Sequence, residues 1–216
     1  MDGAKYGQAW AAGGFADWLR TTHRVRREPQ FDGDVPCGHC NACCRAAYFV
    51  PIAADEVDVL NRIPGEYLFP DRQQSGAMAM SANGQGQCPL LVEGACTVYA
   101  HRPRACRKYD CRVFAAAGLG PAHPAEAQVA ERVWQWRFDY PQDEDGQLHA
   151  AVVAAVAYLQ TQGRGCLPLD ARPTRPIELA LLALRLSSTF LPTVLGVELT
   201  SAQIRAQVRE RLRLPW

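Results

Sequence analysis

The sequence Cys37-Gly-His-Cys40-Asn-Ala-Cys43-Cys44 places four thiols within eight residues. Four more cysteines follow at Cys88, Cys96, Cys106 and Cys111, and Cys166 stands alone. Thiols at this density either cross-link a chain or bind a soft metal ion. The choice between these two uses determines what can be expected of the rest of the chain.

The redox compartment favours metal over disulfides. The segment that begins at Met1 has no apolar run of the secretory type. The longest uncharged apolar stretches are Ala150 to Leu159 and Leu186 to Val197, each shorter than the roughly 20 residues of a membrane span. We therefore expect a cytoplasmic protein without a membrane segment, where clustered cysteines bind metal or perform redox chemistry. The odd total of nine cysteines also argues against a closed disulfide framework.

The spacing of the thiols is typical of a zinc site or an iron–sulfur cluster. Four thiolates suit tetrahedral Zn²⁺ or iron, and C-x2-C-x2-C opens the bacterial ferredoxin signature. The chain departs from that signature because its next cysteine, Cys44, is adjacent to Cys43. Eight thiols could form two four-ligand sites, or one cluster with spare thiols. The predicted metal ligands are Cys37, Cys40, Cys43, Cys44, Cys88, Cys96, Cys106 and Cys111.

The second group of cysteines lies among cations and turns. Arg102, Arg104, Arg107, Lys108 and Arg112 surround Cys106 and Cys111 in the sequence, and neighbouring cations favour thiolate over thiol. Turns are expected at residues 81–86 and at residues 93–94, with a hairpin of residues 88–92 and 95–99 as the one β-structure of the chain. Backbone N–H groups of such turns can point at bound sulfur.

Taken together, these residues resemble the YkgJ-type CxxCxxCC cysteine-cluster family. The resemblance rests on the cysteine run and on Cys88-Pro-x-Leu, Gly94-x-Cys96, Tyr99, Arg102-Pro103 and Cys106-Arg107. The family is described as zinc- or iron-chelating, and its members are often labelled iron–sulfur proteins or oxidoreductases. The resemblance therefore implies a metal centre, with Tyr99, Arg102 and Arg107 as residues that contact the cofactor.

Outside this region the pattern is mainly helical. A first helix is expected over residues 6–21, weakened by Gly13-Gly14, followed by a basic tether over residues 23–27. The motif Cys37, Cys40 and Cys44 would share one face if helical. A short helix is expected over residues 53–63, with Val57, Leu60 and Ile63 inward. From Ala125 onward the spacing predicts helices, the last of them opened by a capping box of Thr200 and Gln203.

These elements predict a mainly α, α+β fold with three regions. Residues 1–32 form an N-terminal helix and basic tether, residues 33–113 a cysteine-cluster metal module with a short β-hairpin, and residues 114–216 a C-terminal helical region packed against it. His39 and His101 are alternative ligands, although exposed positions fit them better. Asp55 and Glu56 are expected in the first turn of a helix, and Cys166 as a small buried apolar residue.

The sequence leaves several functions open. The favoured hypothesis is an iron–sulfur protein, with a [4Fe-4S] cluster and a redox partner protein. A zinc-stabilised interaction module and a metal-handling or thiol-redox protein are the alternatives. Nucleic acid is not favoured, because the net charge is only +1. A flagellin lysine methylase has a similar cysteine pattern, but no Gly-rich nucleotide loop supports methyl transfer here. Whether the protein is an enzyme, for example an oxidoreductase, stays open.

Overall fold

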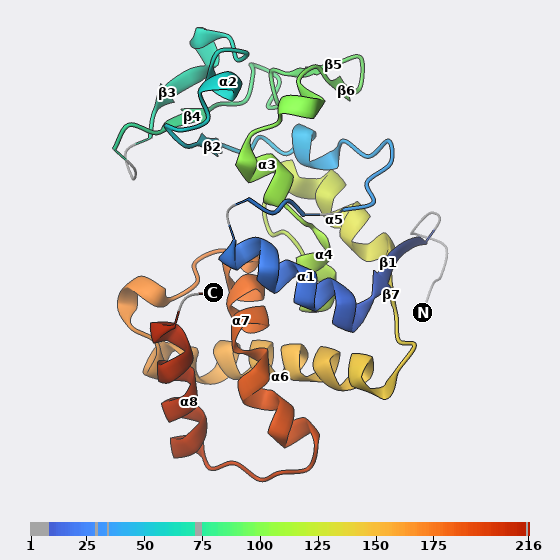
Figure 1. The fold of residues 1–216 in the computed structure, drawn as a ribbon, viewed down its shortest axis with the longest axis vertical. Coiled ribbons are helices and arrows are strands. Elements are labelled where there is room, and N and C mark those ends of the chain that lie inside the picture. Colours follow the sequence, from blue (N-terminus) through green and yellow to red (C-terminus); the bar gives the residue numbers. More distant parts are fainter. Residues whose placement is uncertain (1–8, 29, 34, 72–74, 215) are drawn as a thin grey trace. The chain divides into compact units, whose positions relative to one another are not determined.

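A computed structural model describes residues 9–28, 30–33, 35–71, 75–214 and 216 (Figure 1). The described residues are mainly helical with three small sheets, which confirms the expected α+β, mainly α class. The chain divides into two compact units. The helical unit comprises Met1–Pro29, Cys111–Ala122 and Val133–Trp216, and the cysteine unit comprises Gln30–Asp110 and His123–Arg132. The predicted limits at residues 33 and 113 stay a prediction.

The helical unit is built on five helices and one pair of strands among its described residues. Its elements are β1 (Trp10–Gly14), α1 (Phe15–Arg27), α4 (Arg112–Ala116), β7 (Trp136–Asp139), α6 (Asp143–Cys166), η5 (Leu169–Ala171), α7 (Pro176–Val194) and α8 (Ser201–Arg213). The boundary between the units falls within α5 (Ala127–Gln135). β1 and β7 pair in parallel, with Trp10 opposite Trp136 and an irregularity at Gly13, whose φ of 88° suits glycine.

The first helix begins later and extends further than its sequence suggested. Residues 10–14 form β1, so the prediction of a helix there is wrong, and its residues 6–8 lie outside the described residues. The predicted basic tether at residues 23–27 is also wrong, because these residues form the last turns of α1. Buried residues continue along one face of that helix: Phe15, Trp18, Leu19, Thr22 and Val25. This helical spacing outweighs the local run of arginines.

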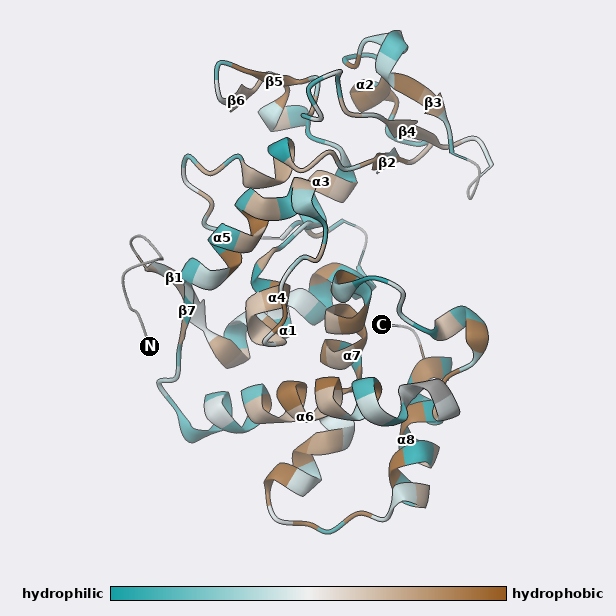
Figure 2. Cartoon of the chain, turned by 180° about the vertical axis from the view of Figure 1, so that it is seen from behind, coloured by the Kyte–Doolittle hydropathy of each residue, from teal (hydrophilic) through white to brown (hydrophobic). Residues whose placement is uncertain are grey.

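The core of the helical unit lies between α6 and α7, which cross and pack against each other (Figure 1). Small residues on α6, such as Ala151 and Ala155, are fully buried and let the helices approach closely. Leu184 and Leu186 of α7 are fully buried as well, and burial of one such side chain contributes roughly 1.5–3 kcal/mol. Figure 2 shows apolar turns along both helices.

Within the described part of the chain, α7 is also the one helix that meets the length and composition of a membrane span. Its apolar window has a mean hydropathy of 1.4. Here it packs against α4, α6 and α8, as the central helix of a protein core does.

A buried carboxylate ties α1 to the start of α6. Asp145 is 3% exposed, and its side chain accepts hydrogen bonds from Ala16 N at 2.8 Å and from Gln142 N at 3.0 Å. The first of these bonds satisfies an N–H in the first turn of α1, which has no partner within the helix. Asp145 therefore joins two helix N-termini that are far apart in the sequence.

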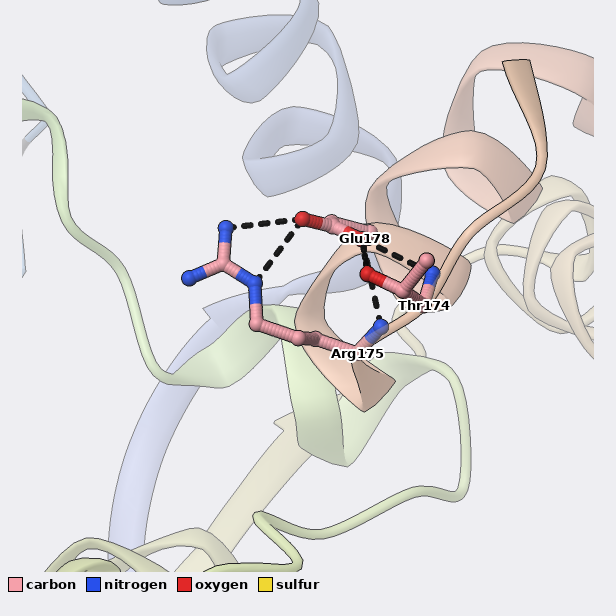
Figure 3. A network of polar contacts seen from close by, with 3 residues as sticks. All are labelled: Thr174, Arg175 and Glu178. Atoms are coloured by element: carbon pink, nitrogen blue, oxygen red, sulfur yellow. Dashed lines mark hydrogen bonds and ion pairs between the residues drawn. The ribbon is translucent and has the colours of Figure 1, made fainter. Parts of the chain in front are cut away.

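The C-terminal helices begin at well-formed caps. The capping box of Thr200 and Gln203 at α8 is confirmed. At α7, Glu178 accepts hydrogen bonds from Thr174 N and Oγ1, both at 2.9 Å, and from Arg175 Nε at 2.8 Å (Figure 3). Partial burial raises the pKa of Glu178, but these bonds outweigh burial and lower the pKa to about 2.

The cysteine unit is assembled from short elements. They are η1 (Ala42–Arg45), β2 (Val50–Ile52), α2 (Val57–Leu60), η2 (Gly65–Tyr67), β3 (Leu68–Pro70), β4 (Met78–Met80), β5 (Leu91–Val92), β6 (Ala95–Cys96), η3 (Tyr99–His101), α3 (Arg104–Lys108) and η4 (Pro124–Glu126). The strands β2, β4 and β3 form an antiparallel sheet in that order, and β5 pairs with β6. The hairpin is confirmed in a shorter form, but the expectation that it would be the one β-structure is wrong.

A small apolar core supports this sheet. Ile52 and Met80 on one face of the strands pack with Val59, Ile63 and Leu90. The predicted helix over residues 53–63 is reduced to the single turn α2, and Val57, expected inward, is 57% exposed. Val59 and Ile63 are buried in the core and Leu60 packs against it, while Val57 points away because the chain leaves the helical path after one turn.

Replacement of Glu178 by Gln tests the cap of α7. The pKa of Glu178 in the folded state lies below its ordinary value of 4.5, so the carboxylate stabilises the fold above about pH 4.5 and this contribution is lost as the pH falls toward 2. Because Glu178 is about a third exposed, we expect a loss of only about 0.5–1 kcal/mol at pH 7. Urea unfolding at several pH values measures this loss. The difference in free energy of unfolding between the variant and wild type should vanish near pH 2.

The exposed Glu198→Gln is the matched control and should change stability little at any pH. If the difference in free energy of unfolding between Glu178→Gln and wild type does not change with pH, the carboxylate charge does not stabilise the cap.

Candidate metal centre

Seven of the eight clustered cysteines belong to the cysteine unit, and all nine cysteines of the chain are free thiols. They lie on separate short segments: Cys37 and Cys40 in a turn, Cys43 and Cys44 in η1, Cys88 just before β5, Cys96 in β6 and Cys106 in α3. Cys43 is exposed and the other six are half-buried. The unit thus presents thiols from four parts of the chain.

The cysteine run folds as two consecutive turns. Cys40 N donates a hydrogen bond to Cys37 O at 2.8 Å, and Gly38 between them has a left-handed φ of 52°. Cys44 N donates to Asn41 O at 2.9 Å within η1. The segment is not one helix, so the condition for a shared helical face of Cys37, Cys40 and Cys44 is not met. Two tight turns at a spacing of two intervening residues are typical of metal-binding loops.

The β5–β6 hairpin is tied directly to this run. Glu93 and Gly94 both have positive φ, at 50° and 81°, as a two-residue hairpin turn requires. Asn41 Nδ2 donates to Gly94 O at 2.9 Å, and Arg45 Nε donates to Asn41 Oδ1 at 3.0 Å. Cys88 N also donates to Cys44 O at 2.7 Å. These bonds connect the segments of Cys44, Cys88 and Cys96.

A buried glutamate holds the helix that carries Cys106. Glu56 is 7% exposed and accepts hydrogen bonds from Arg104 N at 2.6 Å and from Ala53 N at 3.0 Å. Arg104 N opens α3, where backbone N–H groups have no partner within the helix. The prediction that Glu56 lies in the first turn of a helix is wrong, since it precedes α2 and caps α3. Sequence reasoning missed this role, because a long-range cap has no local signature.

The adjacent thiols Cys43 and Cys44 differ strongly in acidity. A hydrogen bond between the two side chains raises the pKa of Cys43 far above its usual range and lowers that of Cys44 to about 7. Burial opposes the change at Cys44, while Arg102 and Arg45 favour the thiolate. Cys44 is therefore the thiol of the run best prepared to act as a thiolate ligand.

The pKa values of the other thiols are raised mainly by burial. Burial raises the pKa of Cys88 to about 11 and that of Cys106 to about 12, and it also raises the pKa of Cys96. Cys44 adds to the increase at all three, which shows that the four sulfurs lie within electrostatic reach of one another. A bound cation would reverse this repulsion and deprotonate the ligands.

Backbone hydrogen bonds already favour thiolates at two of these positions. Leu90 and Leu91 hydrogen-bond Cys88, and Val98 hydrogen-bonds Cys96, in each case lowering the pKa of the thiol. These N–H groups belong to residues beside the cysteines and not to the turns at residues 81–86 and 93–94, so the expected role of those turns stays a prediction. Such hydrogen bonds to sulfur tune metal–thiolate centres.

Arg102 supplies positive charge to the same group of thiols. It lowers the pKa of Cys44, Cys96 and Cys106, and its guanidinium carbon lies 3.8 Å from the centroid of the exposed Tyr99 ring. Its Nε is buried without a hydrogen-bond partner among the described residues. Arg107, also predicted to contact the cofactor, instead pairs with Asp32 at 3.3 Å.

The remaining predicted residues lie outside this group. His39 and His101 are exposed. Cys111 belongs to the helical unit, where it is buried at the start of α4 and accepts a hydrogen bond from Trp136 Nε1 at 3.1 Å. Cys166 is buried, as expected, and its Sγ donates to Gln162 O at 2.8 Å. The role of Cys111 as a ligand stays a prediction.

The residues present fit a thiolate-bound metal. Cys44, Cys88, Cys96 and Cys106 are soft, half-buried donors. Arg102, whose buried Nε has no hydrogen-bond partner among the described residues, acts electrostatically on three of them. Nevertheless, no three His, Cys, Asp or Glu side chains among the described residues are gathered tightly enough to hold a single ion.

Replacement of Asn41 by Ala tests the scaffold of the site. It removes both side-chain bonds to the hairpin and the run, so we expect metal affinity to fall about tenfold, as for other outer residues of metal sites. Competition of the metal-loaded protein with a chelator measures this. The exposed Asn61→Ala is the control, and an equal affinity of the two variants would remove Asn41 from the scaffold.

Comparison with known proteins matches residues 36–133, somewhat less than half of the chain, to the CxxCxxCC family model, described as a "putative zinc- or iron-chelating domain". No curated protein and no solved structure matches the chain. The match begins just before Cys37 and continues beyond Cys111 to include residues 123–132, which also belong to the cysteine unit.

Proposed function

We propose that this protein carries an iron–sulfur cluster and transfers electrons, because residues 36–133 match the model of a zinc- or iron-chelating domain. Cys44, Cys88, Cys96 and Cys106 are its proposed ligands. When bound, a [4Fe-4S] cluster supplies one-electron redox chemistry. A reducing compartment such as the cytoplasm suits nine free thiols and is part of this proposal.

One observation carries the choice of a cluster over a single ion. The four thiols influence each other's ionisation, yet no three potential ligands among the described residues converge on one point. A mononuclear Zn–S₄ site with bonds of about 2.3 Å requires sulfurs about 3.8 Å apart. In a cluster each cysteine binds its own iron, and inorganic sulfide bridges the metals, so the ligand sulfurs can stay farther apart.

The chain's own residues would hold and tune this centre. Backbone hydrogen bonds at Cys88 and Cys96 stabilise sulfur as thiolate, and Arg102 offsets the negative charge of the cluster. Cys43, exposed and held in the thiol form, is a spare thiol in this arrangement. Cys37 and Cys40 belong to the same loop and could replace one of the four ligands.

Anaerobic purification followed by metal and sulfide analysis tests the function. The proposal predicts iron with matching acid-labile sulfide and a broad visible absorption band. Zinc without iron, in a colourless protein, would refute the electron-transfer function and favour the zinc-stabilised module. Iron or zinc in sub-stoichiometric, rapidly exchanging amounts would instead favour the metal-handling alternative.

A pair of serine variants locates the centre in the same experiment. Cys44→Ser should lose most of the iron and sulfide, because an alkoxide ligand is disfavoured at neutral pH. Cys166→Ser should retain both, because serine can still donate to Gln162 O. Full iron and sulfide in Cys44→Ser would exclude Cys44 as a ligand.

Replacement of Arg102 by Gln tests the charge beside the cluster. Removal of a positive charge favours the oxidised form, so we expect the reduction potential to fall by on the order of 60 mV, about 1.4 kcal/mol for one electron. Arg102→Lys should retain part of the wild-type potential, and the exposed Arg62→Gln is the control. Protein-film voltammetry measures all three, and equal potentials for Arg102→Gln and Arg62→Gln would contradict the assignment.

A further inference from the structure

Two tyrosines join the segments that leave the centre. Tyr48 follows Cys44 by four residues, and Tyr109 follows Cys106 by three. Their hydroxyl oxygens lie 3.1 Å apart, and their ring centroids lie 5.6 Å apart at an interplanar angle of 50°. The chain beyond one proposed ligand is therefore in contact with the chain beyond another.

An acid from a third segment completes this contact. The Glu126 side chain in η4 hydrogen-bonds Tyr48, and its Oε2 accepts a bond from His123 N at 3.2 Å. A carboxylate can only accept, so Tyr48 donates to Glu126 and accepts from Tyr109. Burial is the largest cause of the raised pKa of Tyr48, and a neutral phenol is the form that this chain of bonds requires.

We propose that Glu126 is a positioning residue for the metal centre. Through Tyr48 and Tyr109, it fixes the separation of the segments that carry Cys44 and Cys106, without itself contacting the metal. This inference rests on the proposed metal centre, but it holds for either zinc or iron. It also gives a physical reason why residues 123–132 belong to the cysteine unit and why the family match extends past Cys111 to residue 133.

Two further observations place Tyr48 and Glu126 close to the cysteine run. Cys43 contributes to the raised pKa of Tyr48, so the tyrosine lies within reach of the cysteine run. η1, which carries Cys43 and Cys44, and η4, which carries Glu126, contact each other directly. Loss of the Glu126–Tyr48 bond would therefore loosen the run of ligands itself.

Metal retention in variants of the full-length, metal-loaded protein tests the proposal. Glu126→Ala and Tyr48→Phe should each release metal to a chelator about tenfold faster than wild type, within the range for outer residues of metal sites. Glu126→Gln keeps a carbonyl acceptor for Tyr48, so it should restore most of the wild-type rate. The visible or circular-dichroism spectrum of the centre should shift in the first two variants and not in the third.

Matched controls separate positioning from general destabilisation. Glu131→Ala removes an exposed carboxylate from α5 and should release metal at the wild-type rate. If Glu126→Ala does not fold, Glu126→Asp takes its place, because the shorter side chain withdraws the acceptor from Tyr48. Wild-type release in Glu126→Ala, or equal release in Glu126→Ala and Glu126→Gln, would overturn the proposal. A finding of zinc would refute the cluster alone and leave these rates interpretable.

Discussion

The cysteine unit depends on the compensation of charge among its thiols. Cys44 raises the pKa of Cys88, Cys96 and Cys106, so four thiolates would repel one another in the absence of a cation. The chain supplies partial compensation through Arg102 and through backbone hydrogen bonds to sulfur. A metal centre supplies the rest, and its binding free energy thereby becomes part of the folding free energy of this unit.

The scaffold around the thiols is stabilised by only a small apolar core. Its strands are two or three residues long, and its core is a small cluster around Ile52 and Met80. Polar links replace core packing: Asn41 binds the hairpin, Glu56 caps α3, and Tyr48 binds Tyr109. The helical unit shows the opposite balance, with long helices packed through buried alanines and leucines.

The sequence predicted most where the signal is local. The capping box at Thr200 and the two-residue turn at Glu93-Gly94 involve neighbours in the chain, and both are confirmed. The pairing of β1 with β7 was missed, because it joins segments more than 100 positions apart in the sequence and has no period of its own. Residues 23–27 were assigned to a tether because their charges hide one buried position, Val25.

The same limit applies to the candidate site. Cysteine spacing predicted the thiols, and the family resemblance together with the local positive charge predicted Arg102, because these signals are visible in a sequence. Asn41, Glu56 and Glu126 act on groups about 50 to 80 positions away, so no local pattern could reveal them. Their roles follow only from the folded chain.

X-ray absorption at the metal edge of the purified protein tests the central claim most directly, since it reports the donors and any neighbouring metal. We expect a shell of sulfur alone at about 2.3 Å together with a metal–metal vector. A shell dominated by nitrogen or oxygen would contradict a thiolate centre, and a sulfur shell without a second metal would contradict the cluster.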